Sequence, residues 1–309
     1  MLRPYIIRHA RSPYLTMRVV SLLPAATEIV AALGAGSMLV GVSHECDYPP
    51  EVRALPRVTR SGIDPALASA EIDRAVAEAK RAGGAPIEVD VPLVARLRPD
   101  VIIGQSVCDV CAVGPGELER VVASLMPTPW VVTLHAHTLD GVLDDVRKVG
   151  DAVQLADEAT ELVAGLRYRL RRVRDRAHGP ADVGAQHAAP LPKPRVLVLE
   201  WLDPPYVAGH WVPELVALAG GHAVAGAPGE PSHTRAWRDL AALAPDLVVI
   251  ALCGFDVPRA RTELAAVTDG DARALFDRRV EFLDGSAYTS RPGPRLVDAA
   301  EIFARLITR

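Results

Sequence analysis

The sequence predicts an α/β protein of two Rossmann-like lobes joined by a single long helix. Short apolar runs rich in β-branched residues alternate with helical stretches in both halves of the chain, as in parallel sheets with crossover helices. A stretch without proline separates the two halves and has the apolar spacing of one long helix. The chain has 309 residues, of which 50% are hydrophobic, so it is large enough for two cores.

The first half of the chain alternates predicted strands and helices. The strands are expected at 18–23, 39–42, 101–104 and 130–134, and the helices at 27–33, 69–82, 92–97 and 117–125. Ser69 is a suitable N-cap, and the apolar residues after it recur with a period of about 3.6 residues. Arg98 precedes Pro99, which disfavours the helical conformation and ends a helix just before its strand.

The apolar pattern predicts one continuous helix over 139–176. In the division of the chain, the segment 139–178 is assigned to this interlobe helix. Its apolar residues lie on one face, and the arginines between Arg167 and Arg176 suit a helix end that faces water. An alternative is a coiled coil with another chain, although the spacing favours one buried face over strict heptads. The segment 179–194 is rich in Pro, Gly and Ala and is predicted to be a linker.

The second half repeats the pattern of the first. Its strands are expected at 195–199, 247–251 and 280–283, and its helices at 212–219, 236–243 and 294–307. The segments 98–103 and 244–250 both have a proline and an aspartate directly before an apolar strand, which indicates two similar lobes. The expected division is an N-terminal extension at 1–16, an N-terminal lobe at 17–138, the interlobe helix, the linker, and a C-terminal lobe at 195–309.

Composition and missing motifs argue against several classes of function. The net charge of −4 is spread along the chain without a basic stripe, so we expect no nucleic-acid partner. The sequence has no phosphate-binding loop, nucleophile elbow or zinc-protease histidine pair, so no catalytic residue is predicted and an enzyme is not expected.

No apolar run reaches the roughly 18–20 residues of a membrane span. Residues 1–16 lack the apolar core of a secretory signal, and a cytoplasmic location is therefore expected.

Aromatic side chains gather in the loops that follow the predicted strands. In open α/β sheets ligands bind beyond the carboxyl ends of the strands, and a large flat ligand needs aromatic surface there. The alternative for any single aromatic residue is that it packs its loop against the sheet edge. The predicted ligand-binding residues are Asp47, Tyr48, Trp201, Tyr206, Trp211, Phe255, Tyr288 and Arg291.

The four cysteines also follow predicted strands. Cys108 and Cys111 have the spacing that lets two thiolates bind one metal ion, and the four thiols are expected near one another at the mouth of a cleft between the lobes. Two alternatives are a reduced turn at Cys108 and Cys111 beside two unrelated thiols, and a redox disulfide. The reduced turn is favoured over both a shared metal site and the disulfide. His135 and His137 follow a strand, and ordinary loop histidines are favoured there over metal ligands. The candidate ligands of a metal or iron-sulfur cluster are Cys46, Cys108, Cys111, Cys253 and His44.

Several motifs resemble those of the cobalamin-binding family of class III periplasmic binding proteins. They are VVSLLPAATE at 19–28, DYPP at 47–50, LRPDVI at 97–102, DPPY at 203–206 and GPRL at 293–296. Two further motifs, HECD at 44–47 and CDVCAV at 108–113, are similar to a subgroup whose members look cytosolic. The resemblance covers about residues 18–307 and includes the interlobe helix.

The resemblance implies a fold of the helical-backbone metal-receptor type, with the ligand held by loops between the lobes. It implies cobalamin, a related corrinoid or another metal chelate as the ligand, bound for transport or for intracellular handling. Members that deliver to an ABC permease use one acidic residue on each lobe. Glu71 is at the first of these positions, and the second aligns near Ala217, one turn from Glu214. Two alternatives stay open: a cytosolic metalloprotein or redox enzyme with a cysteine-ligated metal, and an interaction protein without a ligand.

Overall fold

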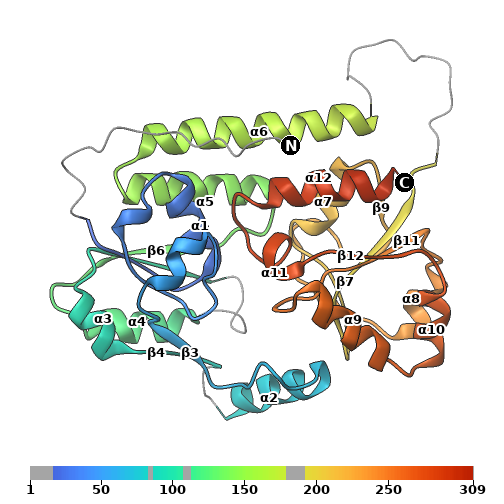
Figure 1. Ribbon diagram of the computed structural model, residues 1–309, viewed down its shortest axis with the longest axis horizontal. Helices are drawn as coiled ribbons and strands as arrows, with labels where there is room; N and C mark the ends of the chain where they lie inside the picture. Colours follow the sequence, from blue (N-terminus) through green and yellow to red (C-terminus); the bar gives the residue numbers. More distant parts are fainter. Residues whose placement is uncertain (1–16, 83–85, 107–112, 179–191, 309) are drawn as a thin grey trace.

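Two α/β lobes lie side by side beneath one long helix, which confirms the fold class (Figure 1). The computed structural model describes residues 17–82, 86–106, 113–178 and 192–308. Cys108 and Cys111, the extension 1–16 and most of the predicted linker lie outside these ranges. None of the helices within them is long and apolar enough to cross a membrane.

The sheet of the N-terminal lobe is parallel and has the strand order β2-β1-β5-β6. Apolar side chains cover both of its faces, because helices pack on either side, and this explains the nearly continuous apolar strands of the sequence. The strands are β1 (Val19–Ser21), β2 (Leu39–Val42), β5 (Val101–Gln105) and β6 (Trp130–Leu134), and the helices are α1 (Pro24–Ala32), α3 (Val91–Leu97), α4 (Pro115–Ala123) and α5 (Leu139–Ala152).

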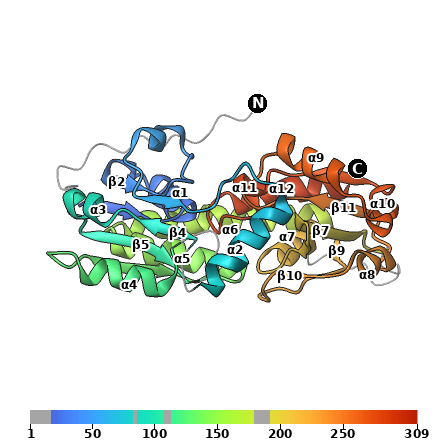
Figure 2. The same ribbon diagram turned by 90° about the horizontal axis from the view of Figure 1, so that it is seen from below.

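The segment between β2 and α3 extends from the N-terminal lobe to the C-terminal lobe. It consists of the antiparallel pair β3 (Thr59–Ser61) and β4 (Ile87–Val89), with α2 (Ser69–Arg81) between them. The short 3-10 helix η1 (Gly36–Met38) lies directly before β2, and a second one, η2 (Pro50–Ala54), lies after it. Figures 1 and 2 place α2 on the side of the molecule away from the long helix and next to the C-terminal lobe.

The C-terminal lobe has a mixed sheet. Its path is β10-β8-β7-β11-β12, and β9 also pairs with β7; the β7, β11 and β12 strands are parallel, and β8 is antiparallel to β7. The strands are β7 (Arg195–Leu202), β8 (Pro205–Val207), β9 (His222–Ala223), β10 (His233–Thr234), β11 (Leu247–Ile250) and β12 (Val280–Phe282). The helices are α7 (Val212–Leu218), α8 (Trp237–Ala242), α9 (Val257–Ala266), α10 (Gly270–Phe276), α11 (Gly285–Tyr288) and α12 (Leu296–Ile307).

The prediction of one uninterrupted helix over 139–176 is wrong. The segment folds into two helices, α5 and α6 (Ala156–His178), and Gln154 between them has a left-handed backbone with φ of 61°. The two helices pack closely at Gly150, where a Cβ would collide with the Cβ of Ala159. No glycine or proline lies at the break itself, and glutamine is uncommon in the left-handed conformation. The sequence therefore gives no signal that the helix ends there.

The α6 helix packs against the cores of both lobes. Val163 and Leu166 belong to the core of the N-terminal lobe, and Val173 belongs to that of the C-terminal lobe. Arg169 ties α6 to α12 through Asp298 at 2.5 Å and Glu301 at 3.0 Å. The apolar face of α6 is therefore covered by its own chain, which argues against the alternative of a coiled coil with another chain.

Candidate functional site at the lobe interface

Arg291 links the two lobes at one end of their interface. Its side chain is 11% exposed, and it contacts Asp47 at 2.5 Å and Glu28 at 3.3 Å, both from the N-terminal lobe. It also donates a hydrogen bond to the carbonyl oxygen of Glu45 at 3.2 Å. Asp47 and Arg291, two of the predicted ligand residues, thus meet across the interface.

Arg295 brings two predicted aromatic residues together beside this contact. Its guanidinium lies over the ring of Tyr48, 4.3 Å from the centroid, and over that of Tyr288 at 4.9 Å. Tyr48 comes from the N-terminal lobe and is 46% exposed, so much of its ring is open to solvent. The cation–π contact with Arg295 holds the Tyr48 ring in place and leaves nearly half of the residue exposed.

Glu28 is the buried anion of this cluster. It lies on α1 and accepts contacts from Arg291 and from Arg295, the latter at 3.4 Å, while its second carboxylate oxygen has no partner among the described residues. Burial raises the pKa of Glu28, and the charges of Arg295 and Arg291 oppose that rise. The carboxylate is therefore in an environment that disfavours its charge despite the two arginines.

A second group of predicted ligand residues packs against α2. The Trp201 Nε1–H donates to the Ser69 carbonyl oxygen at 3.3 Å, and its ring lies 5.1 Å from that of Phe255. The Tyr206 hydroxyl donates to the Asp73 carboxylate at 3.5 Å. Trp201, Tyr206 and Phe255 are thus brought together by contacts with the N-terminal lobe or with one another.

Arg259 and Glu263 on α9 fix the start of α2 to the C-terminal lobe. Their side chains pair at 2.8 Å. Arg259 also donates to the Leu67 carbonyl oxygen at 2.7 Å, and the Ser69 N–H donates to Glu263 at 3.1 Å. The Arg259 guanidinium lies 4.8 Å from the centroid of the Phe255 ring. Arg259 and Glu263 therefore each form a hydrogen bond with a backbone group of the segment that leads into α2.

Trp211 is a packing residue in this structure. It belongs to the core of the C-terminal lobe, and its Nε1–H donates to the Thr289 carbonyl oxygen at 2.8 Å. The buried indole therefore has its hydrogen-bond partner within the protein, as large buried aromatics usually do. The prediction that places Trp211 against a ligand does not fit its position.

The structure does not place Cys46 at the mouth of a cleft. Its side chain is buried in the core of the N-terminal lobe, with the sulfur 3.1 Å from the Thr27 hydroxyl. Burial raises the pKa of the thiol to about 11, which opposes metal binding by its thiolate. Free cysteine often behaves as a small apolar residue, and that is the reason the prediction fails here.

The other candidate metal ligands are not brought together where the structure describes them. Cys253 lies in the turn after β11 in the C-terminal lobe. The Nδ1 of His44 lies 2.7 Å from the Thr59 hydroxyl, and burial and then the charge of Arg57 lower the pKa of its ring. Within the described ranges no group of three or more His, Cys, Asp or Glu side chains could hold a metal ion.

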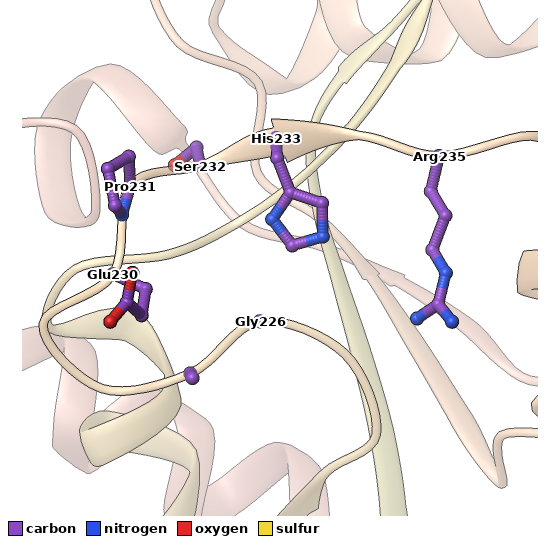
Figure 3. A pocket seen from close by; sticks show the side chains of 7 residues that line it. Gly226, Glu230, Pro231, Ser232, His233 and Arg235 are labelled. Carbon is purple, nitrogen blue, oxygen red and sulfur yellow. The ribbon is translucent and has the colours of Figure 1, made fainter.

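Two pockets lie away from the predicted ligand residues. One, of about 550 Å³, lies in the C-terminal lobe, where His233 and Arg235 extend from one strand segment and Glu230 approaches from the preceding loop (Figure 3). The other, of about 770 Å³, lies between α5, α6 and α7 and is lined by Arg167, Arg171 and Arg174 together with leucines. No predicted ligand residue lines either pocket.

Two lobes bridged by one helix, with charged and aromatic loops facing each other between them, define a bilobed ligand-binding protein. The sequence matches the family model described as periplasmic binding protein over residues 19–253, and the chain belongs to that family.

Relatives match almost the whole chain. The vitamin B12-binding protein of Vibrio cholerae serotype O1 is 24% identical over 297 residues, which cover 94% of this chain and 88% of the relative. A periplasmic heme-binding protein from Pseudomonas aeruginosa has a TM-score of 0.68 at 26% identity, with 94% and 92% of the chains covered. The solved periplasmic vitamin B12-binding protein of Vibrio cholerae has a TM-score of 0.64 at 21% identity, with 94% and 96% covered.

Sequence reasoning missed several residues of the interface. Glu28 and Arg295 both lie inside motifs that carried the family resemblance, but only their neighbours were chosen as site residues. Arg259 and Glu263 are four residues apart, as an ion pair on a helix requires, and this spacing was the available signal.

Proposed function

We propose that the protein binds cobalamin, or a related metal chelate with a flat macrocycle, at the interface between its lobes. The observation that carries the proposal is the open ring of Tyr48, which Arg295 holds in place beside Tyr288 and Arg291. Such a site offers aromatic surface for a macrocycle and guanidinium groups for its polar edge. The similarity to the vitamin B12-binding protein over 94% of the chain supports cobalamin as the first candidate.

Heme is the second candidate ligand. The heme-binding protein of Pseudomonas aeruginosa has the same fold at 26% identity, and both ligands are metal chelates of a tetrapyrrole. Cobalamin carries amide side chains and heme carries carboxylates, so the two ligands make different demands on Arg291 and Arg295. Because Asp47 already neutralises Arg291, the site favours the uncharged edge of cobalamin.

Titration of the full chain with each ligand tests the proposal. Trp201 lies near the interface, so a corrin or heme bound there should quench tryptophan fluorescence by energy transfer. We expect saturable quenching by cobalamin with a sub-micromolar Kd, and weaker binding of heme. Tighter binding of heme than of cobalamin would reassign the ligand within the same site. If neither ligand quenched fluorescence at tens of micromolar, the proposed function would be refuted.

Delivery to an ABC permease is a further part of the proposal. Glu71 lies in the first turn of α2, and its side chain accepts from the Ala68 N–H at 3.1 Å. Glu214 lies in the first turn of α7, where it accepts from the Leu139 N–H at 2.7 Å. Each carboxylate accepts a backbone N–H at the start of a helix, which holds it in a fixed position.

The cytoplasmic location stays a prediction, and cell fractionation with an antibody to the native protein would test it.

A further inference from the structure

His137 and His210 face each other across the junction of the lobes. Their Nδ1 atoms lie 3.2 Å apart, and their ring centroids lie 5.2 Å apart. His137 precedes α5 and follows the last strand of the N-terminal lobe, whereas His210 lies between β8 and α7 in the C-terminal lobe. Each lobe therefore contributes one imidazole to the pair.

The backbone around His210 fixes the position of its ring. His210 has a left-handed backbone with φ of 51°, a conformation that histidine adopts more readily than most residues. Its N–H donates to the Glu230 carbonyl oxygen at 2.7 Å, and its own carbonyl oxygen accepts from the Gly229 N–H at 2.9 Å. The ring stacks on buried Trp211, with centroids 5.4 Å apart. An uncommon backbone conformation held by this many contacts is typical of functional positions.

The backbone next to His137 is also fixed. Thr138 caps α5 by accepting from the Gly141 N–H at 3.1 Å, and the next residue, Leu139, donates its N–H to Glu214 of the C-terminal lobe at 2.7 Å. The His137 ring itself is exposed, so solutes can reach the pair from solvent.

The separation of the two nitrogens matches that of two ligands on one metal ion. With metal–nitrogen bonds of about 2.0–2.1 Å, two nitrogens lie about 3.3 Å apart on a tetrahedral ion and about 2.9 Å apart in adjacent octahedral positions. Opposite octahedral positions would separate them by about 4.1 Å. The observed 3.2 Å lies between the two values for adjacent ligands. A metal that sits in a tetrapyrrole has only opposite positions open, so its geometry does not suit the pair.

We propose that His137 and His210 bind one divalent transition-metal ion of the Ni²⁺, Cu²⁺ or Zn²⁺ class between the lobes. Imidazole nitrogen is a good ligand for these ions. Water would complete the coordination, since the described residues offer no third protein ligand close by. In the absence of metal, one ring donates its Nδ1–H to the other. The bound ion would link the lobes at the junction, independently of any ligand at Tyr48.

Calorimetric titration of the full chain with Ni²⁺ near neutral pH tests the proposal. Asparagine suits the test because it tolerates the left-handed backbone of His210 and lacks an imidazole. We expect one Ni²⁺ per chain in the wild type, and binding weaker by about tenfold or more in His137→Asn and in His210→Asn. His222→Asn, on an exposed residue away from the pair, is the matched control and should bind as the wild type does.

Two measurements separate this site from binding by the cysteines. Co²⁺ bound by imidazole and water lacks the intense thiolate-to-metal absorption that a cysteine site would give, so we expect no such band. Circular dichroism should show that all three variants fold. The proposal is overturned if the wild type binds no Ni²⁺ at millimolar concentration, if His210→Asn binds as tightly as the wild type, or if the thiolate band accounts for all bound Co²⁺.

Discussion

Removal of the Tyr48 ring should weaken ligand binding by an amount that the structure allows us to calculate. A fully buried tyrosine covers about 150–250 Å² of surface, and 46% of Tyr48 is exposed, so about 90 Å² is available to a ligand. At about 25 cal/mol per Å², covering that area contributes about 2 kcal/mol, or about 30-fold in Kd. We therefore expect Tyr48→Ala to raise the Kd for cobalamin by about that factor.

The assay is fluorescence titration, because Tyr48→Ala leaves all the tryptophans in place. Tyr168→Ala is the matched control: this tyrosine on α6 is 55% exposed and also contacts an arginine, Arg172, at 5.9 Å from the ring centroid. The control should bind cobalamin as the wild type does. A Kd for Tyr48→Ala within about threefold of the wild type would refute the assignment of this ring to the ligand site.

Three further predictions concern stability and reactivity. Gly150→Ala should lower the urea midpoint, because overpacking against Ala159 costs about 1–3 kcal/mol, whereas Gly165→Ala, with open space around it, should raise stability by up to about 1 kcal/mol; equal effects would contradict the packing at Gly150. The raised pKa of Glu28 means that the folded chain binds its proton at higher pH than the unfolded chain does, so its contribution to stability falls as pH rises above about 4.5. Urea titrations over a pH series should show the wild type losing stability relative to Glu28→Gln across that window, and a constant or opposite difference would contradict this sign. With a pKa of about 11, Cys46 should resist alkylation at pH 8 in the folded protein and react after unfolding, as mass spectrometry of its peptide can show; rapid labelling of the folded chain would count against the buried thiol.

The sequence predicts most elements of the fold because their patterns are local. The strand at 130–134 matches β6 at both ends, and the helix predicted at 69–82 differs from α2 by one residue. The break at Gln154 depends instead on tertiary packing of Gly150 against Ala159, which no local signal reports. The helices α9 and α10 were not predicted, since both are short and each buries only two residues, so neither shows a clear apolar face.

The candidate site is predictable only in part. Strand-end loops do bring Asp47, Tyr48 and Arg291 together, because strand order and lobe pairing follow from the fold class. The sequence could not tell an exposed aromatic such as Tyr48 from a buried one such as Trp211, since both occur in loops and only packing separates them. It also could not show which lobe α2 would contact.

The contact between α2 and the C-terminal lobe has a consequence for how a ligand enters. The start of α2 contacts Trp201 through the Ser69 carbonyl oxygen, so we expect a ligand that reaches Trp201 to displace this segment and to break the hydrogen bonds from Ser69 to Glu263 and from Arg259 to Leu67. The apparent Kd is then the intrinsic Kd divided by the fraction of molecules in which α2 has swung open. Weakening these two hydrogen bonds should therefore tighten apparent binding and speed association, even though neither bond touches the ligand.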